Sequence, residues 1–130
     1  MSDANDFKTQ VLRVFVALYR AHPRVIELSS EQTHSPPPNR NDISYTDELI
    51  SSGGTIAWLY RNRFVSGEFH EMNPGSCMTG AQLSASGYAI FRKVHSNVGR
   101  SLGEAAVEAI DKHDEREISV LAGLLMDELA

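Results

Sequence analysis

The residue types with the greatest chemical potential gather in one short stretch, where His70 and Glu71 precede Cys77. Imidazole, carboxylate and thiolate side chains all bind zinc, and a thiolate can also act as a nucleophile. These three residues lie in or beside a turn-rich segment, at a spacing that matches no known ligand pattern. We therefore expect no metal site, and a single cysteine cannot form an internal disulfide bond.

Phosphate-binding and hydrolytic motifs are also missing from the sequence. The chain contains no G-x-x-x-x-G-K-[ST], no G-x-G-x-x-G and no H-E-x-x-H. Gly53 and Gly54 precede a predicted helix whose start could receive one anion, but a glycine turn between two helices needs no ligand to explain it. We therefore expect a protein that is not an enzyme and that uses no cofactor.

Length and composition indicate one soluble domain. The chain has 130 residues, of which 42% are hydrophobic, and this size fits a single hydrophobic core. Its longest apolar run, residues 14–18, is far shorter than a membrane span. The first residues lack the basic start and apolar stretch of a signal peptide. These features predict a cytoplasmic protein with no membrane partner.

Charge is distributed unevenly along the chain, whose net charge is −5. Residues 54–100 contain 5 Lys or Arg against 2 Asp or Glu, whereas residues 101–130 contain 2 basic and 8 acidic residues. An acidic protein is a poor non-specific binder of nucleic acid, because phosphate neutralisation needs clustered Lys and Arg. The basic middle segment remains compatible with a local DNA contact, and equally with an ordinary solvated surface.

In the first half of the chain, apolar residues at three- and four-residue spacings predict a helix over residues 6–21, ended by Pro23. Residues 25–28 alternate as a short extended piece. The polar, proline-rich residues 29–41 predict a loop. A short helix from Ser44 to Ser51, a break at Gly53-Gly54 and a second helix from Thr55 to Asn62 would then form a helix-turn-helix.

The second half of the chain predicts a β-hairpin followed by helices. Residues 64–70 and 78–83 read as its strands, joined by the turn-forming sequence Asn-Pro-Gly-Ser at residues 73–76. Ser84 and Ser101 are placed to cap two further helices, and a last helix follows His113-Asp114.

This order of elements is the plan of the winged helix-turn-helix family. Residues 54–65, GTIAWLYRNRFV, resemble the family's recognition helix running into the first wing strand, and residues 82–90, QLSASGYAI, resemble its passage into the closing helix. The opening segment, from Leu12 through His22-Pro23 to Leu28, is similar to the first helix of small winged-helix proteins of bacteria, phages and mobile elements. The resemblance implies a mainly α fold with a small β-hairpin (α+β). A winged helix-turn-helix domain would occupy residues 1–100, and a C-terminal helical hairpin residues 101–130.

The resemblance also implies a DNA-binding function. In this family the recognition helix enters the major groove and the wing tip, here residues 70–80, lies beside it. Arginine can bond guanine bidentately, and asparagine can do the same with adenine. We therefore expect a sequence-specific binder of double-stranded DNA that regulates transcription or a mobile element. Its DNA-binding residues would be Thr55, Ala57, Trp58, Arg61, Asn62 and Arg63, most of them facing outward.

A second interpretation is a winged-helix protein-interaction module, such as a phage-type inhibitor or adaptor that binds a host protein complex. The wing tip offers Glu71 where a DNA-binding wing usually offers Lys or Arg. Trp58 and Tyr60 would suit a protein interface, in which Trp is a favoured anchor. Trp58 also lies beside Ile56 and Leu59, however, which is typical of a core residue.

The apolar stripe of residues 101–129 is wide enough to need a covering partner. That partner is either the same domain or a second copy of the chain. The second possibility predicts a homodimer. Its interface would consist of Leu102, Ile110, Ile118, Leu121, Leu124 and Leu125.

Overall fold

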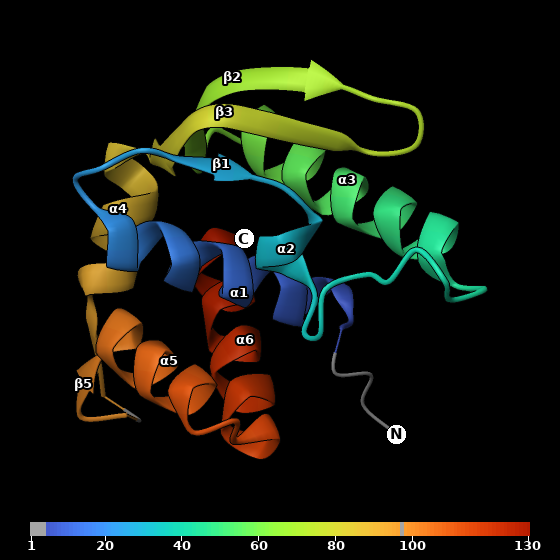
Figure 1. Cartoon of the computed structure of the whole chain (residues 1–130). Coiled ribbons are helices and arrows are strands. Elements are labelled where there is room, and N and C mark those ends of the chain that lie inside the picture. The colour runs from blue at the N-terminus through green and yellow to red at the C-terminus, as the bar shows by residue number, and fades with distance from the viewer. Residues whose placement is uncertain (1–4, 97) are drawn as a thin grey trace.

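In the computed structural model, which describes residues 5–96 and 98–130, the helix α1 (Phe7–Ala21) lies at the centre of the molecule (Figure 1). It contacts the other five helices as well as strands β1 and β3. Asp6 caps its start by accepting a hydrogen bond from the Thr9 backbone N–H at 3.0 Å. Phe15 and Leu18 are buried in the core. The helix predicted over residues 6–21 is confirmed.

One antiparallel sheet covers α1 and α3. It consists of β1 (Ile26–Leu28), β2 (Val65–Glu71) and β3 (Ser76–Leu83), in the spatial order β1–β3–β2. β2 and β3 form the predicted hairpin, and their register pairs Val65 with Leu83 and Glu71 with Ser76. Met78, Ala81 and Leu83 of β3 are buried, so the central strand supplies most of the sheet's contribution to the core, with Leu28 of β1 and Val65 of β2 adding one residue each.

The structure does not contain the predicted helix-turn-helix of residues 44–51 and 55–62 as two separate helices. A short helix, α2 (Ser30–Thr33), lies inside the predicted loop of residues 29–41, and Ser29 and Gln32 form a capping box at its start. The two helices predicted on either side of Gly53-Gly54 are one continuous helix, α3 (Tyr45–Arg61). Thr33 of α2 donates a hydrogen bond to Ser52 of α3 at 2.8 Å, so the two helices are joined directly.

The predicted break at Gly53-Gly54 is wrong because a tertiary contact uses Gly53 inside the helix. A Cβ atom at Gly53 would lie 2.6 Å from the Cα of Gly75, in the tip of the β2–β3 hairpin. The Ser76 hydroxyl also donates to the Gly53 carbonyl at 2.8 Å. The hairpin tip therefore seats directly on the helix backbone, and glycine permits this close approach.

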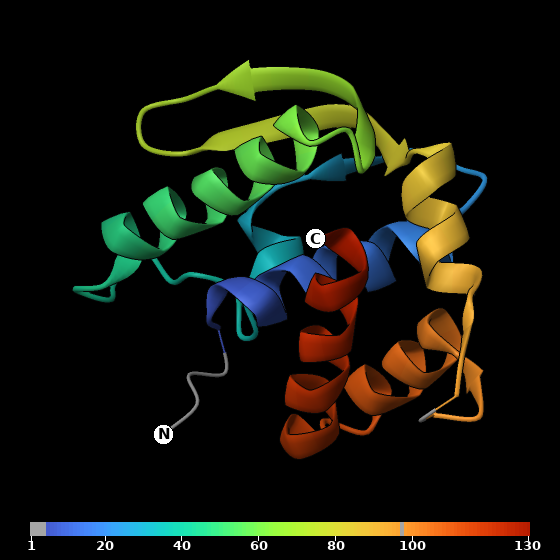
Figure 2. The same ribbon diagram turned by 180° about the vertical axis from the view of Figure 1, so that it is seen from behind.

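The C-terminal third forms three helices: α4 (Ala85–Arg92), α5 (Leu102–Asp111) and α6 (Glu115–Leu129). The two-residue strands β4 (Val94–His95) and β5 (Arg100–Ser101) pair between α4 and α5. Ser84 and Ser101 cap α4 and α5 as predicted. Figure 2 shows α6 lying across α1, with α5 beside it. In the described part of the chain, no helix combines the length and apolar character that crossing a membrane requires.

The α5–α6 hairpin is covered by its own domain. Leu102, Ile118, Leu121 and Leu125 are at most 4% exposed within the core of the same chain. Ile110 and Leu124 are partly buried against that core. The prediction that these residues join two copies is wrong for the four buried leucine and isoleucine side chains, because α1 and the rest of the domain already occupy the face they form.

Candidate interaction surface

Two of the residues predicted to contact DNA point into the protein. Thr55 is 2% exposed, and its hydroxyl donates to the Gln10 side-chain oxygen at 2.7 Å. Ala57 is 9% exposed and belongs to the core. Because α3 is one helix, and Gly53 must face the hairpin tip, the rotation of the whole helix is fixed. That rotation turns Thr55 and Ala57 inward, which corrects the expectation that they face outward.

Trp58 lies at the edge of the core. It is half-buried, with its ring edge-to-face against Phe7 at 5.2 Å and tilted against Phe64 at 5.8 Å. Tyr60 is 40% exposed and stacks on Phe69 of β2 at 5.0 Å. Trp58 and Tyr60 thus have ring partners within the domain, as expected if Trp58 is a core residue.

Arg61, Asn62 and Arg63 are exposed, but they lie at the C-terminal end of α3. The Asn62 side-chain amide donates to the Trp58 carbonyl at 2.8 Å, and Arg63 adopts a left-handed φ of 63° where the helix ends. At a rise of 1.5 Å per residue they lie about 24 Å from the start of α3. The residues of a recognition helix that contact base edges are those near its N-terminus.

The outward face of α3 carries a different set of residues. Asp47, Ile50 and Gly54 follow one another at spacings of three and four, which places them on one side of the helix, and all three are exposed. Ile43, in the loop before α3, is fully exposed, and Met72 in the hairpin tip is 58% exposed. We call Ile43, Asp47, Ile50, Gly54 and Met72 the α3–tip surface.

The parts of the α3–tip surface lie at the same end of the molecule. The tip that carries Met72 touches the middle of α3, because a Cβ at Gly75 would lie 2.8 Å from the carbonyl oxygen of Leu49, next to Ile50. Figure 1 shows the hairpin running along α3 toward the helix start, with the preceding loop beyond it. Exposed apolar side chains from three segments of the chain therefore lie at one end of the protein.

The electrostatic character of this surface is acidic. Asp42 and Glu71 lie beside Ile43 and Met72 in the sequence, and Asp47 lies on the surface itself. Among the described residues, none of these three acids forms an ion pair with a basic side chain. From residue 40 to residue 54, Arg40 is the sole Lys or Arg. An acidic and apolar surface repels the phosphates of DNA and suits a protein partner.

Gly54 is the candidate surface residue that the sequence analysis does not single out, because it interprets both glycines as a turn. A Cβ built on Gly54 meets no atom within 4 Å, in contrast to one built on Gly53. Glycine in the middle of a helix lowers stability by about 1 kcal/mol relative to alanine. No contact within the described residues requires glycine at this exposed position. Its lack of a side chain leaves a shallow gap in the outward face of α3, next to Ile50.

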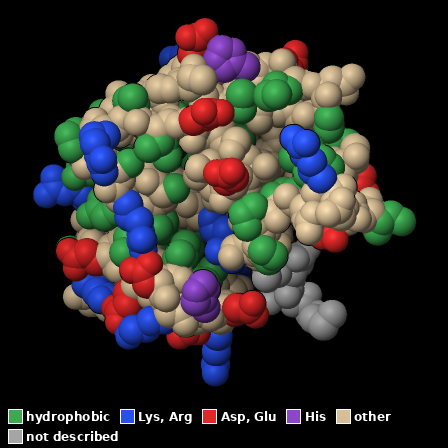
Figure 3. Space-filling model, in the orientation of Figure 1, with side chains coloured by type: hydrophobic (Ala, Val, Ile, Leu, Met, Phe, Trp, Pro, Cys, Tyr) green, Lys and Arg blue, Asp and Glu red, His purple; other side chains and the backbone are tan. Residues whose placement is uncertain are grey.

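Three acids of the C-terminal helices pair with basic side chains of the same chain. Asp111 pairs with Arg20 of α1, Glu128 with Lys93, and Glu108 with both Arg100 and Lys112. Hydrogen bonds from Lys112 and Arg100 hold the pKa of Glu108 below its ordinary value. Figure 3 shows acidic and basic side chains interleaved over the region of α5.

His70 and Cys77 are paired across the hairpin, while Glu71 lies opposite Ser76. The His70 ring nitrogen Nε2 lies 3.0 Å from the Thr79 hydroxyl and 3.8 Å from the Glu68 carboxylate. Among residues 5–96 and 98–130, no three His, Cys, Asp or Glu side chains are grouped so that they could hold a metal ion.

Comparisons with protein-family models, with curated proteins and with solved structures find no match to this chain.

Proposed function

We propose that this protein is a winged-helix interaction module that binds another protein through the α3–tip surface. The order α1–β1–α2–α3–β2–β3, with strands in the spatial order β1–β3–β2, supports the winged-helix interpretation. In that plan α3 is the recognition helix and the β2–β3 hairpin is the wing. The same helix and wing can serve a protein partner, because a fold does not dictate what its recognition surface binds.

Gly54 is the observation that carries this proposal. It lies in the middle of the outward face of the recognition helix, and it weakens that helix without a compensating contact inside the described domain. A partner that approaches the α3 backbone closely at this position would explain why glycine stands there. Exposed Ile50, one turn before Gly54, would then pack beside the partner's inserted side chain.

The partner's chemistry follows from the surface. Ile43, Ile50 and Met72 offer an apolar centre, which calls for apolar side chains on the partner. Asp42, Asp47 and Glu71 lie in or beside it. A protein surface with an apolar centre and a rim of Lys or Arg complements this arrangement in both respects.

Photo-crosslinking inside cells tests this proposal, and it compares two exposed helix positions in the same kind of cell. The photo-crosslinking amino acid p-benzoylphenylalanine replaces Ile50 on α3 or, as control, Val120 on α6, which are 55% and 52% exposed. We expect a discrete crosslinked protein from position 50 and none from position 120. Equal products from both positions would mean that the crosslinks report random collisions.

Two glycine-to-alanine variants then test the role of the gap at Gly54. Gly54→Ala fills it, whereas Gly123→Ala adds the same methyl group to α6, where a Cβ also meets nothing within 4 Å. Both changes should stabilise the fold by about 0.5–1 kcal/mol. We expect Gly54→Ala to reduce the crosslink from position 50 about fivefold or more, and Gly123→Ala to leave it unchanged. An undiminished crosslink in Gly54→Ala contradicts the proposal.

Sequence-specific DNA binding is the second candidate function. The strand order and the exposed Arg61, Asn62 and Arg63 favour it, since these side chains can contact phosphates or base edges. It predicts binding to pooled duplex DNA that weakens steeply with added salt and that falls in the double variant Arg61→Ala/Arg63→Ala. Absence of binding even at low salt rejects this second function and leaves the first untouched.

A further inference from the structure

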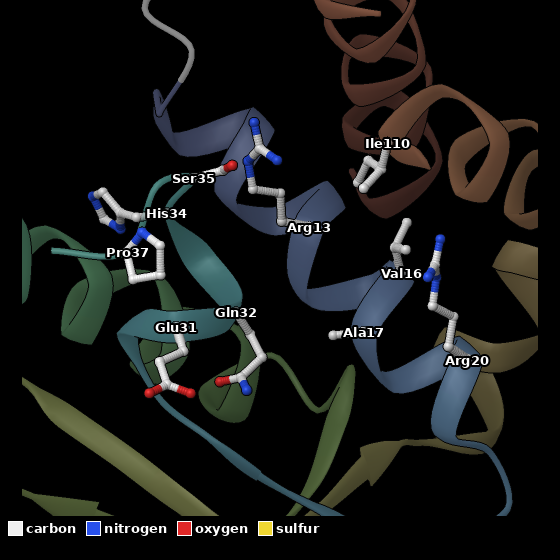
Figure 4. Close-up of a pocket in the computed structure, with 10 residues that line it drawn as sticks. All are labelled: Arg13, Val16, Ala17, Arg20, Glu31, Gln32, His34, Ser35, Pro37 and Ile110. Atoms are coloured by element: carbon white, nitrogen blue, oxygen red, sulfur yellow. The ribbon is translucent and has the colours of Figure 1, made fainter. Parts of the chain in front are cut away.

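Two cavities of the protein contain arginine side chains, and they differ in whether the positive charge is already engaged. One, of about 320 Å³, lies between α1 and the segment from α2 to Pro37 (Figure 4). Its Arg20 pairs with Asp111. Its Arg13 has an interaction of its own within the structure; burial lowers the pKa of this guanidinium, and the carboxylate of Glu115 acts in the opposite direction. Both arginines of this first cavity therefore have partners inside the protein.

The second cavity, of about 510 Å³, lies where α4 packs against α5. Tyr19 of α1, Tyr88 and Arg92 of α4, and Ser101 and Glu104 at the start of α5 form much of its lining. Its volume falls within the range of small-molecule sites. Because nearly all of its lining residues carry a polar group, we expect a polar ligand.

Arg92 supplies a positive charge to this second cavity that no acid of the described residues balances. Its guanidinium carbon lies 5.7 Å from the centre of the Tyr88 ring, which is an uncharged partner. It forms no ion pair within residues 5–96 and 98–130. Arg100 lines the same cavity, but it pairs with Glu108. Arg92 is therefore the position at which a negatively charged group of a ligand would bind.

Glu104 supplies a negative charge to the same cavity. Its backbone N–H donates to the Ser101 hydroxyl at 3.1 Å, which holds Glu104 in the first turn of α5. Its carboxylate forms no ion pair within the described part of the chain, with Arg92 or with any other basic residue. An arginine and a glutamate that line one cavity without pairing leave a position for each sign of charge on a ligand.

We propose that this cavity binds a small zwitterion, a molecule with a carboxylate and an ammonium group joined by a short aliphatic chain. The carboxylate lies against the guanidinium of Arg92, and the ammonium group lies against the carboxylate of Glu104. The chain packs on the rings of Tyr19 and Tyr88, which are 5.7 Å apart and whose faces also attract a cation. The site includes no residue of the α3–tip surface, so its failure would leave the proposed protein partner untouched.

Three probes of the same chain length and different charge test the ligand class. At pH 7, 4-aminobutyrate carries both charges, butyrate only the negative one and butylamine only the positive one. In amide ¹H–¹⁵N NMR titrations of the full chain, 4-aminobutyrate should shift the signals of Tyr88, Arg92 and Glu104 and saturate, and each singly charged probe should bind at least about fivefold more weakly.

The same comparison is made at two other separations of the charges, with glycine and with 6-aminohexanoate, each against its singly charged analogues. A zwitterion preferred at one or more of the three lengths supports the proposal. Equal binding of zwitterion and singly charged analogues at every length overturns it, as do shifts confined to other parts of the protein.

Two charge-removing variants should each abolish a different preference, which loss of packing alone would not do. Glu104→Gln should make the zwitterion bind no better than its carboxylate-only analogue, because its ammonium group has lost its partner. Arg92→Gln should make the zwitterion bind no better than its amine-only analogue. A preference that persists in either folded variant rejects the assigned role of that residue and with it the site.

Matched control variants lie at equivalent helix positions outside the cavity. Glu117 is the third residue of α6, where its N–H donates to the capping Asp114, as that of Glu104 does to Ser101 in α5. Arg61 lies in the last turn of α3, as Arg92 does in α4. Glu117→Gln and Arg61→Gln should leave both preferences unchanged. The dispersion of the NMR spectrum shows whether each variant is folded, and alanine replaces glutamine, with the same expected result, in a variant that is not.

Discussion

The acids of α5 and α6 and the acids around the start of α3 differ in what balances their charge. Glu108, Asp111 and Glu128 pair with basic side chains of the same chain, three of which come from α1 or from the segment between residues 93 and 100. Asp47 and Glu71 form no ion pair within the described residues. Ion pairs within the described residues therefore involve three acids of the more acidic region and neither Asp47 nor Glu71 of the other.

The apolar residues of these two regions also differ, in whether the fold buries them. Those of the α5–α6 hairpin are buried on α1, whereas Ile43, Ile50 and Met72 are exposed around the start of α3 and at the hairpin tip. A segment's net charge and apolar stripe thus do not locate an interface by themselves. The useful distinction is whether the fold already supplies the partners, and this can be tested in both regions.

The largest expected effect comes from a charge placed under the α5–α6 hairpin. Leu121 is 0% exposed, so Leu121→Asp buries a carboxylate in an apolar core and should destabilise the protein by more than about 3 kcal/mol. Its neighbour Val120 is 52% exposed, and Val120→Asp should change stability by less than about 0.5 kcal/mol. Urea unfolding followed by circular dichroism measures both. A folded Leu121→Asp protein that has merely changed from dimer to monomer would instead place Leu121 in an interface between two copies of the chain.

A smaller effect distinguishes the two glycines of α3. Gly53→Ala forces a methyl group against the backbone of Gly75, which should destabilise the protein by about 1–3 kcal/mol. Gly54→Ala meets open space and should stabilise it by about 0.5–1 kcal/mol. The midpoints of urea unfolding give the sign of each change. Two changes of the same sign would mean that the hairpin tip does not seat on Gly53.

The elements that could be predicted from the sequence are those with a local signal. Ser84 and Ser101 cap the helices they were expected to cap, and the Asn-Pro-Gly-Ser turn joins β2 to β3. The four-residue helix α2 had such a signal as well, because Ser29 and Gln32 match a capping box. The prolines that follow it led to the prediction of a loop instead.

The parts that could not be predicted depend on contacts between distant residues. Nothing local to Gly53 reveals that Gly75 will lie against it, and without that contact two adjacent glycines favour a break. The wrong prediction of a break also changed the predicted site. A separate helix that starts at Thr55 could turn any of its faces to solvent, whereas the contact at Gly53 fixes the rotation of α3. Thr55 and Ala57 were assigned to the surface for this reason. Ile50 and Gly54, at three- and four-residue spacings from Asp47, could have been found had the helix been recognised as continuous.

The subtlest prediction concerns pH and the paired acids of α5. Hydrogen bonds from Lys112 and Arg100 hold the pKa of Glu108 below its ordinary value of 4.5, so folding favours its charged form. The resulting stabilisation is present in full above the pKa of the unfolded chain, and it is lost as the pH falls through the lower pKa of the folded protein. Glu108→Gln should therefore unfold at a lower urea concentration than the original protein at pH 7, and this gap should close in strongly acidic solution.

Glu71→Gln is the matched control for that experiment, because Glu71 lies at the exposed hairpin tip and forms no ion pair within the described residues. Its urea midpoint should follow that of the original protein at both pH values. A gap for Glu108→Gln that persists unchanged at low pH would assign its effect to packing rather than to charge. A pH-dependent gap of the same size for Glu71→Gln would mean that the tip acid is also balanced inside the fold, which would remove the electrostatic reason for a basic partner at the α3–tip surface.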